Sequence, residues 1–280
     1  MSPGKRHAAD WKDAAAYAPL LQVGRSGFAW EWLRRDESYR AAAVREVSWD
    51  SLEQVTVGNP AATRWGLHAF EAPDRSAIAA RPVWRRAIFP YVLEADAADE
   101  GDDRDRLDLE RLGHFVTLVA DPDGTEHLLL SDGSRSIRVD IASGTVQARP
   151  ALLRYRLAGF RIAEPMLVLR QLLALCCSGE FSAVLHPREQ RAARWILLLR
   201  TYDALAAGAS QRDIAEGLLG LEPIERWRLQ ASSLRSRAQR LVREARQMAA
   251  GGYLSLLNGP QSGSYSPSDS GSTGEKLRRR

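Results

Sequence analysis

The residues best suited to binding chemistry lie near the C-terminal end of the chain. The stretch "SSLRSRAQRLVREARQMAAGGY", residues 232–253, contains five arginines and a single acid. Surface helices normally mix charges, because opposite charges four residues apart stabilise a helix. A helix with so many arginines and so little acid predicts either an ordinary solvated face or contact with a polyanion.

A helical wheel over residues 234–248 separates two faces, at about 100° per residue. One narrow stripe is apolar and consists of Leu234, Ala238, Leu241, Ala245 and Met248. The opposite face has no acid and consists of Arg235, Ser236, Gln239, Arg240, Arg243, Arg246 and Gln247. Such side chains hydrogen-bond phosphates and read base edges in the major groove. We therefore predict that this face binds nucleic acid, whereas Arg237 lies beside the stripe, near Glu244, and braces the helix.

The preceding stretch, "RTYDALAAGASQRDIAEGLLG", predicts a second helix that positions the first. One helix ends at Gly208, and Ser210 caps the next, in which Ile214, Ala215 and Leu218 point inward. A tight glycine turn followed by a capped helix with a small inward alanine is typical of helix-turn-helix units. The candidate DNA contacts at the start of this helix are Ser210, Gln211 and Arg212.

The connection between these helices, "LEPIERWRLQA", is longer than a minimal turn. We expect Trp227 to anchor it, and we take Arg226 and Arg228 as candidate phosphate contacts. A helix fits the major groove of B-form DNA and not that of A-form RNA, so double-stranded DNA is the predicted partner. RNA polymerase or another regulator is a further partner to consider. The alternative hypothesis is an antiactivator, a protein–protein module that binds a partner regulator without touching DNA.

Catalysis is not predicted. The five histidines, His7, His68, His114, His127 and His186, fall in different elements, and no Cys/His cluster has metal spacing. The chain has no P-loop, no GxGxxG after a strand and no GxSxG. We therefore expect no catalytic residue, no cofactor and no metal site. Cys176 and Cys177 are adjacent in an apolar helix, where buried reduced thiols are the prediction.

Charge is segregated along the 280 residues, although the net charge is only +4. Residues 94–132 carry thirteen acids and three bases, whereas residues 226–247 carry seven bases and one acid. The acidic loop 94–110 suits a basic partner or could mask the arginine helix. There is no apolar run of membrane-spanning length and no apolar segment of a signal peptide near the N-terminus, so we expect a cytoplasmic protein without a membrane partner.

The elements predict an α+β fold. The predicted segments are a disordered start at 1–9, an N-terminal helical module at 10–72, a β-rich meander with an acidic loop at 73–150, a C-terminal helix-turn-helix-like domain at 151–259, and a disordered basic-ended tail at 260–280. In the second segment, Asp10 and Ser26 are candidate helix caps, and Phe28, Trp32, Leu33 and Tyr39 form a predicted aromatic core.

The middle of the chain predicts an antiparallel meander. Strand-length runs "HFVTLVA", "TEHLLLS", "SIRVDIA" and "TVQA" alternate with the turns "DPDG", "DG" and "SG". One further strand is expected within "VWRRAIFPYVLEA". From about Leu152 the period becomes helical, with predicted helices in 164–181 and, starting at Pro187, in 186–208. The sequence does not predict an oligomeric state.

Two stretches resemble a known family. "DWKDAAAYAPLLQVGRSGFAWEWLRRDESYRAAA" is similar to the N-terminal module of a proteobacterial family of transcriptional regulators with domains of unknown function. "LHPREQRAARWILLLRTYDALAAGASQRDIAEGLLG" and "WRLQASSLRSRAQRLVREARQMAAGGYLSLL" are similar to its C-terminal module. The family includes FseA-like excision activators and related antiactivators, and its members are typical of integrative and conjugative elements and plasmids. The resemblance implies a DNA-binding activator of excision or transfer genes, without catalytic or base-reading residues to carry over.

Overall fold

The computed structural model describes residues 10–46, 55–98, 102, 105–147, 150–159, 162–220 and 232–259. The predicted start and tail lie outside these residues, as does the connection that holds Arg226, Trp227 and Arg228. The acidic loop is described only in part.

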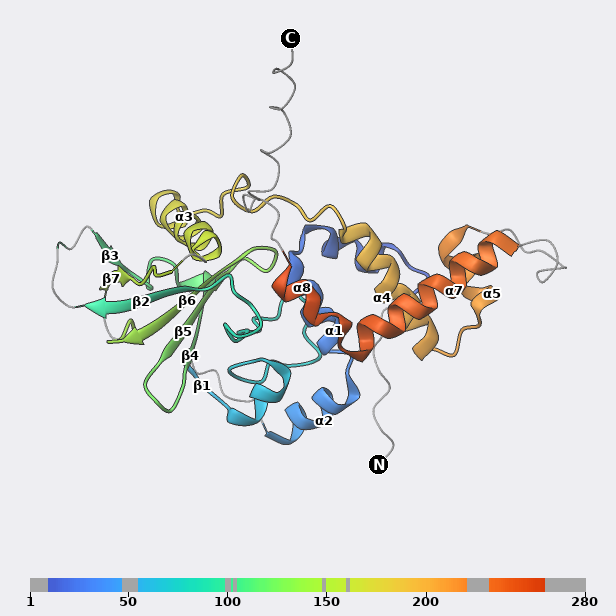
Figure 1. The fold of residues 1–280 in the computed structure, drawn as a ribbon, viewed down its shortest axis with the longest axis horizontal. Coiled ribbons are helices and arrows are strands. Elements are labelled where there is room, and N and C mark those ends of the chain that lie inside the picture. The colour runs from blue at the N-terminus through green and yellow to red at the C-terminus, as the bar shows by residue number, and fades with distance from the viewer. Residues whose placement is uncertain are drawn as a thin grey trace, which may run out of the picture.

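Within the described residues, one sheet of seven strands dominates one end of the molecule (Figure 1). Its strands are β1 (Val55–Val57), β2 (Leu93–Ala98), β3 (Arg106–Leu107), β4 (Val116–Ala120), β5 (Glu126–Ser131), β6 (Ser136–Ser143) and β7 (Ala151–Tyr155). The strand order is β1-β4-β5-β6-β2-β7-β3.

The predicted meander is confirmed for β4, β5 and β6, which pair antiparallel in chain order. Gly124 and Gly133 supply the positive φ angles of its two turns, +87° and +95°. At Gly133 a side chain is also excluded by space, because an added Cβ would lie 2.3 Å from the carbonyl oxygen of Ile78. The meander is therefore fixed by local turn chemistry that the sequence displays.

The sheet as a whole is mixed, so the antiparallel prediction describes only part of it. β1 pairs parallel with β4, and β2 pairs parallel with β6. The expected helical period from Leu152 is wrong, since Ala151–Tyr155 forms β7 and pairs antiparallel with β2. A parallel pair joins strands that are distant in the chain, and no turn motif marks such a pair in the sequence.

The predicted strand "TVQA" does not form over its described residues. The buried carboxylate of Glu126 instead accepts hydrogen bonds from the Thr145 hydroxyl at 2.5 Å, the Val146 amide at 2.9 Å and the Gln147 amide side chain at 2.7 Å. A buried carboxylate needs several donors, so this segment folds around Glu126 rather than pairing as a strand.

The described helices lie on one face and at one end of the sheet. They are η1 (Ala15–Gln22), α1 (Arg25–Leu33), α2 (Glu37–Glu46), η2 (Pro60–Trp65), η4 (Gly113–Phe115), α3 (Ala163–Ser178), α4 (Ala192–Ala206), α5 (Gln211–Leu219), α7 (Ser232–Gln247), η5 (Met248–Gly252) and α8 (Leu254–Asn258). α3 packs on β2 and β6, whereas α4, α5 and α7 form a group away from the sheet, with α1 and α8 between (Figure 1). Among these described helices, none is long and apolar enough to cross a membrane.

Several predicted helix starts are corrected. α1 begins at Arg25 with Gly24 as its N-cap and no side-chain cap, so Ser26 is not the cap. The Asp10 carboxylate accepts from the Lys12 amide, but the first helix starts only at Ala15. α4 starts at Ala192 and not at Pro187. Just before this start, the Glu189 carboxylate accepts from the Arg191 amide at 3.1 Å and from Arg25 of α1 at 2.8 Å, which ties the preceding segment to α1.

A continuous apolar core joins the N-terminal helices, the sheet and the C-terminal helices. The predicted aromatic core is confirmed, because Phe28, Trp32, Leu33 and Tyr39 are each at most 2% exposed. Phe28 meets Trp195 of α4 edge to face, with ring centroids 5.0 Å apart. Edge-to-face aromatic pairs stabilise a core beyond the area that they bury.

A buried ion network, consisting of Tyr17, Glu31, Arg35 and Asp203, ties the N-terminal helices to α4. The Arg35 guanidinium donates to both Asp203 carboxylate oxygens at 2.8 Å, and the Tyr17 hydroxyl donates to Asp203 at 2.7 Å. Arg35 also pairs with Glu31. Burial raises the pKa of Glu31, but Arg35 and Arg34 outweigh it and hold that pKa below its ordinary value.

The two cysteines lie on the outer side of α3. Cys176 and Cys177 are exposed, so the prediction of buried thiols is wrong. The buried side of this helix, which faces the sheet, includes Leu167, Leu172 and Leu175. Because these leucines determine which side of α3 is covered, the cysteines are left facing away from the core.

Candidate nucleic-acid interface

α7 is amphipathic as the helical wheel predicts. Ala238, Leu241 and Ala245 are at most 2% exposed, and Leu234 and Met248 at the two ends of the stripe are half-buried. The stripe packs against α4 and α5, and its far end continues into the main core. The buried stripe therefore fixes which side of α7 faces outward.

The predicted DNA-binding residues of α7 share the outward side. Its exposed members are Ser236, Gln239, Arg240, Arg243, Arg246 and Gln247, and Arg235 is half-buried. Guanidinium, amide and hydroxyl groups can all donate hydrogen bonds to phosphate oxygens or base edges. These residues form an exposed row of hydrogen-bond donors on α7, the α7 row, that a polyanion could approach.

The one acid of α7 is held away from this row. Glu244 forms an ion pair with Arg194 of α4. The prediction that Arg237 braces the helix near Glu244 is wrong, because Arg237 is exposed and α4 supplies the partner instead. α4 and α7 pack side by side, which brings Arg194 within reach. The positive charge of the outward arginines is therefore not neutralised by Glu244.

α5 begins with Ser210 as its cap, as predicted, and the cap is reciprocal with Asp213. The Ser210 hydroxyl accepts from the Asp213 amide at 3.2 Å, and the Ser210 amide donates to the Asp213 carboxylate at 2.8 Å. Hydrogen bonds that the Ser210 side chain and amide donate to the Asp213 carboxylate lower the pKa of that carboxyl. Ser210, Gln211 and Arg212 are all exposed at this helix start, and Arg212 pairs with Glu216 one turn later at 2.7 Å.

The inner side of α5 packs against α4 and α7. Ile214 and Ala215 are fully buried, as predicted, and Leu218 is half-buried. Ile214 shares a small apolar cluster with Ala204 of α4, Val242 of α7 and Trp11. α5 is therefore held at a fixed position beside α7 (Figure 1).

Replacing Ser210 with alanine should lower the free energy of unfolding by about 1 kcal/mol, because the Asp213 amide loses its cap. Thermal or urea unfolding of the whole chain measures the change. Gln211→Ala, at the next exposed position, is the matched control and should change stability by less than about 0.5 kcal/mol. Equal losses in the two variants would contradict a capping role for Ser210.

Two family models match parts of the chain. Residues 161–258, which include α3 to α8, match the family described as "T6SS, Transcription factor, DNA binding domain". Residues 10–68 match the "Proteobacterial transcriptional regulator-like domain". The two matches point to a DNA-binding transcriptional regulator, and neither family is an enzyme family. A search of curated proteins finds no match to the chain.

The DNA-binding match contains every described candidate of the interface. The structure brings the α7 row and the α5 start onto one helical group, formed by α4, α5 and α7. Arg226 and Arg228 lie outside the described residues and stay predictions. Arg194 was not predicted, because its pairing with Glu244 joins residues fifty positions apart in the chain.

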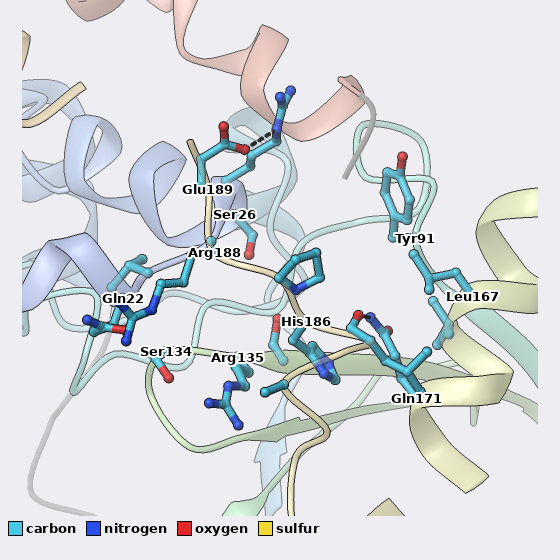
Figure 2. Close-up of a pocket in the computed structure, with 18 of the residues that line it drawn as sticks. Gln22, Ser26, Tyr91, Ser134, Arg135, Leu167, Gln171, His186, Arg188 and Glu189 are labelled. Atoms are coloured by element: carbon cyan, nitrogen blue, oxygen red, sulfur yellow. Dashed lines mark hydrogen bonds and ion pairs between the residues drawn. The ribbon is translucent and has the colours of Figure 1, made fainter. Parts of the chain in front are cut away.

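The structure also has a cleft of about 210 Å³ between the start of α1, α3 and the segment before α4 (Figure 2). Its cationic groups are largely engaged. Arg25 pairs with Glu189 at 2.8 Å, and Arg135 donates to the carbonyl oxygen of Phe181 at 2.6 Å. The cleft was not predicted, because segments distant in the chain form its walls.

A buried polar cluster on the sheet was also missed. His68 lies after η2, Asp121 follows β4 directly, and His127 lies on β5 opposite Asp140 of β6. The pKa of His68 is lowered to about 4, mainly by burial and then by His127 and Arg138. Burial raises the pKa of Asp140, but Arg138 and His127 outweigh it and keep that pKa well below its usual range. Both side chains are therefore far from their ordinary titration behaviour.

Proposed function

We propose that this protein is a transcriptional regulator that binds duplex DNA through α7. The observation that carries the proposal is the exposed row of arginine, glutamine and serine on α7, inside the segment that matches a DNA-binding domain. A helix of this kind fits the major groove, where arginine and glutamine can read guanine and adenine edges.

In this proposal α5 and α7 act as a helix-turn-helix-like unit. α7 is the recognition helix, and Gln239, Arg240 and Arg243 occupy the middle of its exposed face. The capped start of α5 contributes Gln211 and Arg212, which approach the phosphate backbone together with the backbone amides of its first turn. Arg226 and Arg228 in the intervening connection add phosphate contacts.

The proposed regulator activates genes for the excision or transfer of a mobile element. The support for this finer role is the resemblance of residues 10–43, 185–220 and 227–257 to FseA-like excision activators. An activator also needs a surface for RNA polymerase or another regulator, and in this proposal the N-terminal helices and the sheet supply it.

The full chain should bind duplex DNA from upstream of its target operons with strong salt dependence. If six phosphates are contacted, the slope of log K against log salt is about −5, because each contact contributes about −0.9. Fluorescence anisotropy from 50 to 300 mM salt measures the slope, and footprinting on the same DNA locates the operator. Binding that is insensitive to salt and to sequence would contradict the proposal.

The antiactivator alternative predicts a different result in the same assays. An antiactivator would leave DNA free at physiological salt and would bind a purified partner regulator instead. Footprinting of that regulator with and without this chain separates the two functions. A protected operator with this chain alone supports the activator.

A further inference from the structure

The buried cluster of His68, Asp121 and His127 has its ligand atoms at the spacing of a metal site, and its two imidazole rings lie stacked, with centroids 3.4 Å apart and planes 27° apart. One carboxylate oxygen of Asp121 lies 3.1 Å from His68 Nδ1 and 3.1 Å from His127 Nε2. The three side chains offer ligand atoms that all lie within 4.8 Å of one another. In a tetrahedral zinc site with bonds of about 2.0–2.1 Å, neighbouring ligand atoms lie about 3.3 Å apart. The cluster is thus close to the spacing that a bound metal requires, and a turn of one imidazole ring out of the stack brings both nitrogen lone pairs toward one ion.

The hydrogen bonds around His127 favour a cation in the cluster. His127 Nδ1 lies 2.7 Å from a carboxylate oxygen of Asp140, which also accepts from Arg138 at 2.9 Å. A neutral imidazole has a single N–H. When that N–H is on Nδ1 of His127 and donates to Asp140, Nε2 carries a lone pair instead of a hydrogen. That lone pair faces the Asp121 carboxylate, so the two repel unless a proton or a metal ion lies between them.

Asp140 contacts the ring nitrogen of His127 that would not bind the metal, as carboxylates do in known metal sites. Metal-bound histidines generally donate their other ring N–H to a carboxylate, which fixes the tautomer and the ring orientation. The β5–β6 register places His127 directly opposite Asp140. Arg138, two residues before Asp140 on the same strand, donates a hydrogen bond to the Asp140 carboxylate. The orientation of His127 is therefore set by the sheet itself.

Access to the cluster runs through Asp121. The side chains of His68 and His127 are 5% exposed, whereas that of Asp121 is 18% exposed. The absence of a side chain at Gly58 leaves space for the Asp121 carboxylate. A Cβ at position 58 would lie 1.9 Å from Asp121 Oδ1, the carboxylate oxygen that does not contact the histidines. The Asn59 amide donates to the His68 carbonyl at 2.8 Å and fixes the segment on which His68 lies.

From this geometry we infer that the protein binds one divalent transition metal ion, Zn²⁺ by its ligand set, through His68 Nδ1, His127 Nε2 and the Asp121 carboxylate. Two imidazoles and one carboxylate suit zinc and leave a fourth position for water on the exposed side of Asp121. The ion joins the end of the segment 10–68 to the β4–β5 turn. The inference does not depend on the proposed function.

Zinc content and zinc titration of the full chain, purified without a metal-affinity tag, test the inference. Wild type should hold or take up one equivalent of Zn²⁺, and its melting temperature should rise when zinc is added. His127→Gln and Asp121→Asn should lose this equivalent. Asp140→Asn should weaken zinc binding by about 10- to 100-fold, because it removes only the orienting carboxylate. The matched control is His114→Gln, since His114 is an exposed histidine outside the cluster.

Two results would overturn the inference. One is a wild-type chain that takes up no zinc at saturating concentration, and the other is undiminished uptake by His127→Gln and Asp121→Asn. If circular dichroism shows that these variants fail to fold, a titration of the wild-type chain with Co²⁺ tests the inference instead. Visible absorption bands of tetrahedral Co²⁺ that disappear when Zn²⁺ displaces the cobalt support the site. The absence of such bands contradicts it.

Discussion

The double variant Arg240→Ala/Arg243→Ala should bind operator DNA at least about 30-fold more weakly than wild type. Each arginine that reaches a base edge contributes about 1–3 kcal/mol, and tenfold in affinity corresponds to about 1.4 kcal/mol. If the two arginines contact phosphates instead, the salt slope should become shallower by about 2. Both side chains are exposed on α7, so the free energy of unfolding should change by less than about 1 kcal/mol.

The matched control for this variant is Arg111→Ala/Arg170→Ala. Both residues are exposed, neither lies on α5 or α7, and the change in net charge is the same. A comparable loss of affinity in the control would show that net charge, and not the α7 face, determines binding. Unchanged operator binding by Arg240→Ala/Arg243→Ala, with the fold intact, would contradict the proposed role of α7.

The local parts of the candidate interface could be predicted from the sequence. The stripe Ala238, Leu241 and Ala245 repeats at helical spacing, so it fixes both the buried and the exposed side of α7. The Ser210–Asp213 cap is likewise a four-residue pattern. The β4–β5–β6 meander follows from Asp-Gly turns. In each case residues that are close in the chain determine the structure.

The remaining features depend on residues that are distant in the chain. His68 and Asp121 are separated by 53 positions, and Arg35 and Asp203 by 168. No periodicity or turn motif connects such residues, and each of them looks like a surface residue when its own segment is considered alone. The parallel pairs β1–β4 and β2–β6 belong to the same class. Sequence reasoning could therefore predict elements and faces, but not the buried polar contacts that join them.

Replacing Arg35 with alanine should lower the free energy of unfolding by about 3–5 kcal/mol. The substitution removes the one ion pair that the described residues give the buried Asp203, and it leaves Glu31 with Arg34 alone. An uncompensated buried charge carries a penalty of this size. Urea unfolding at pH 7 measures the change. The surface control Arg45→Ala removes an arginine whose side chain is 73% exposed, and it should change stability by less than about 0.5 kcal/mol.

The same network predicts how stability depends on pH. The pKa of Glu31 lies below its ordinary value of 4.5 in the folded chain. The stability that Glu31 contributes is therefore fully present above about pH 4.5 and is lost as the pH falls through the lowered pKa. In Arg35→Ala the larger of the two cationic influences that lower this pKa is absent and only Arg34 remains, so Glu31 should bind a proton at higher pH. The penalty of Arg35→Ala should then shrink in urea unfolding below pH 4.5, and a pH-independent penalty would contradict this account.

Arg35→Ala also distinguishes residues that stabilise the fold from residues that contact DNA. Asp203 lies on α4, and α4 carries the helices α5 and α7 on its other side. Well below its melting temperature, Arg35→Ala keeps the α7 face intact and should bind operator DNA as wild type does, whereas Arg240→Ala/Arg243→Ala should show the reverse pattern. If Arg35→Ala weakens operator binding while the chain is still folded, then the N-terminal helices act on the position of α7, and the ion network is part of regulation as well as of stability.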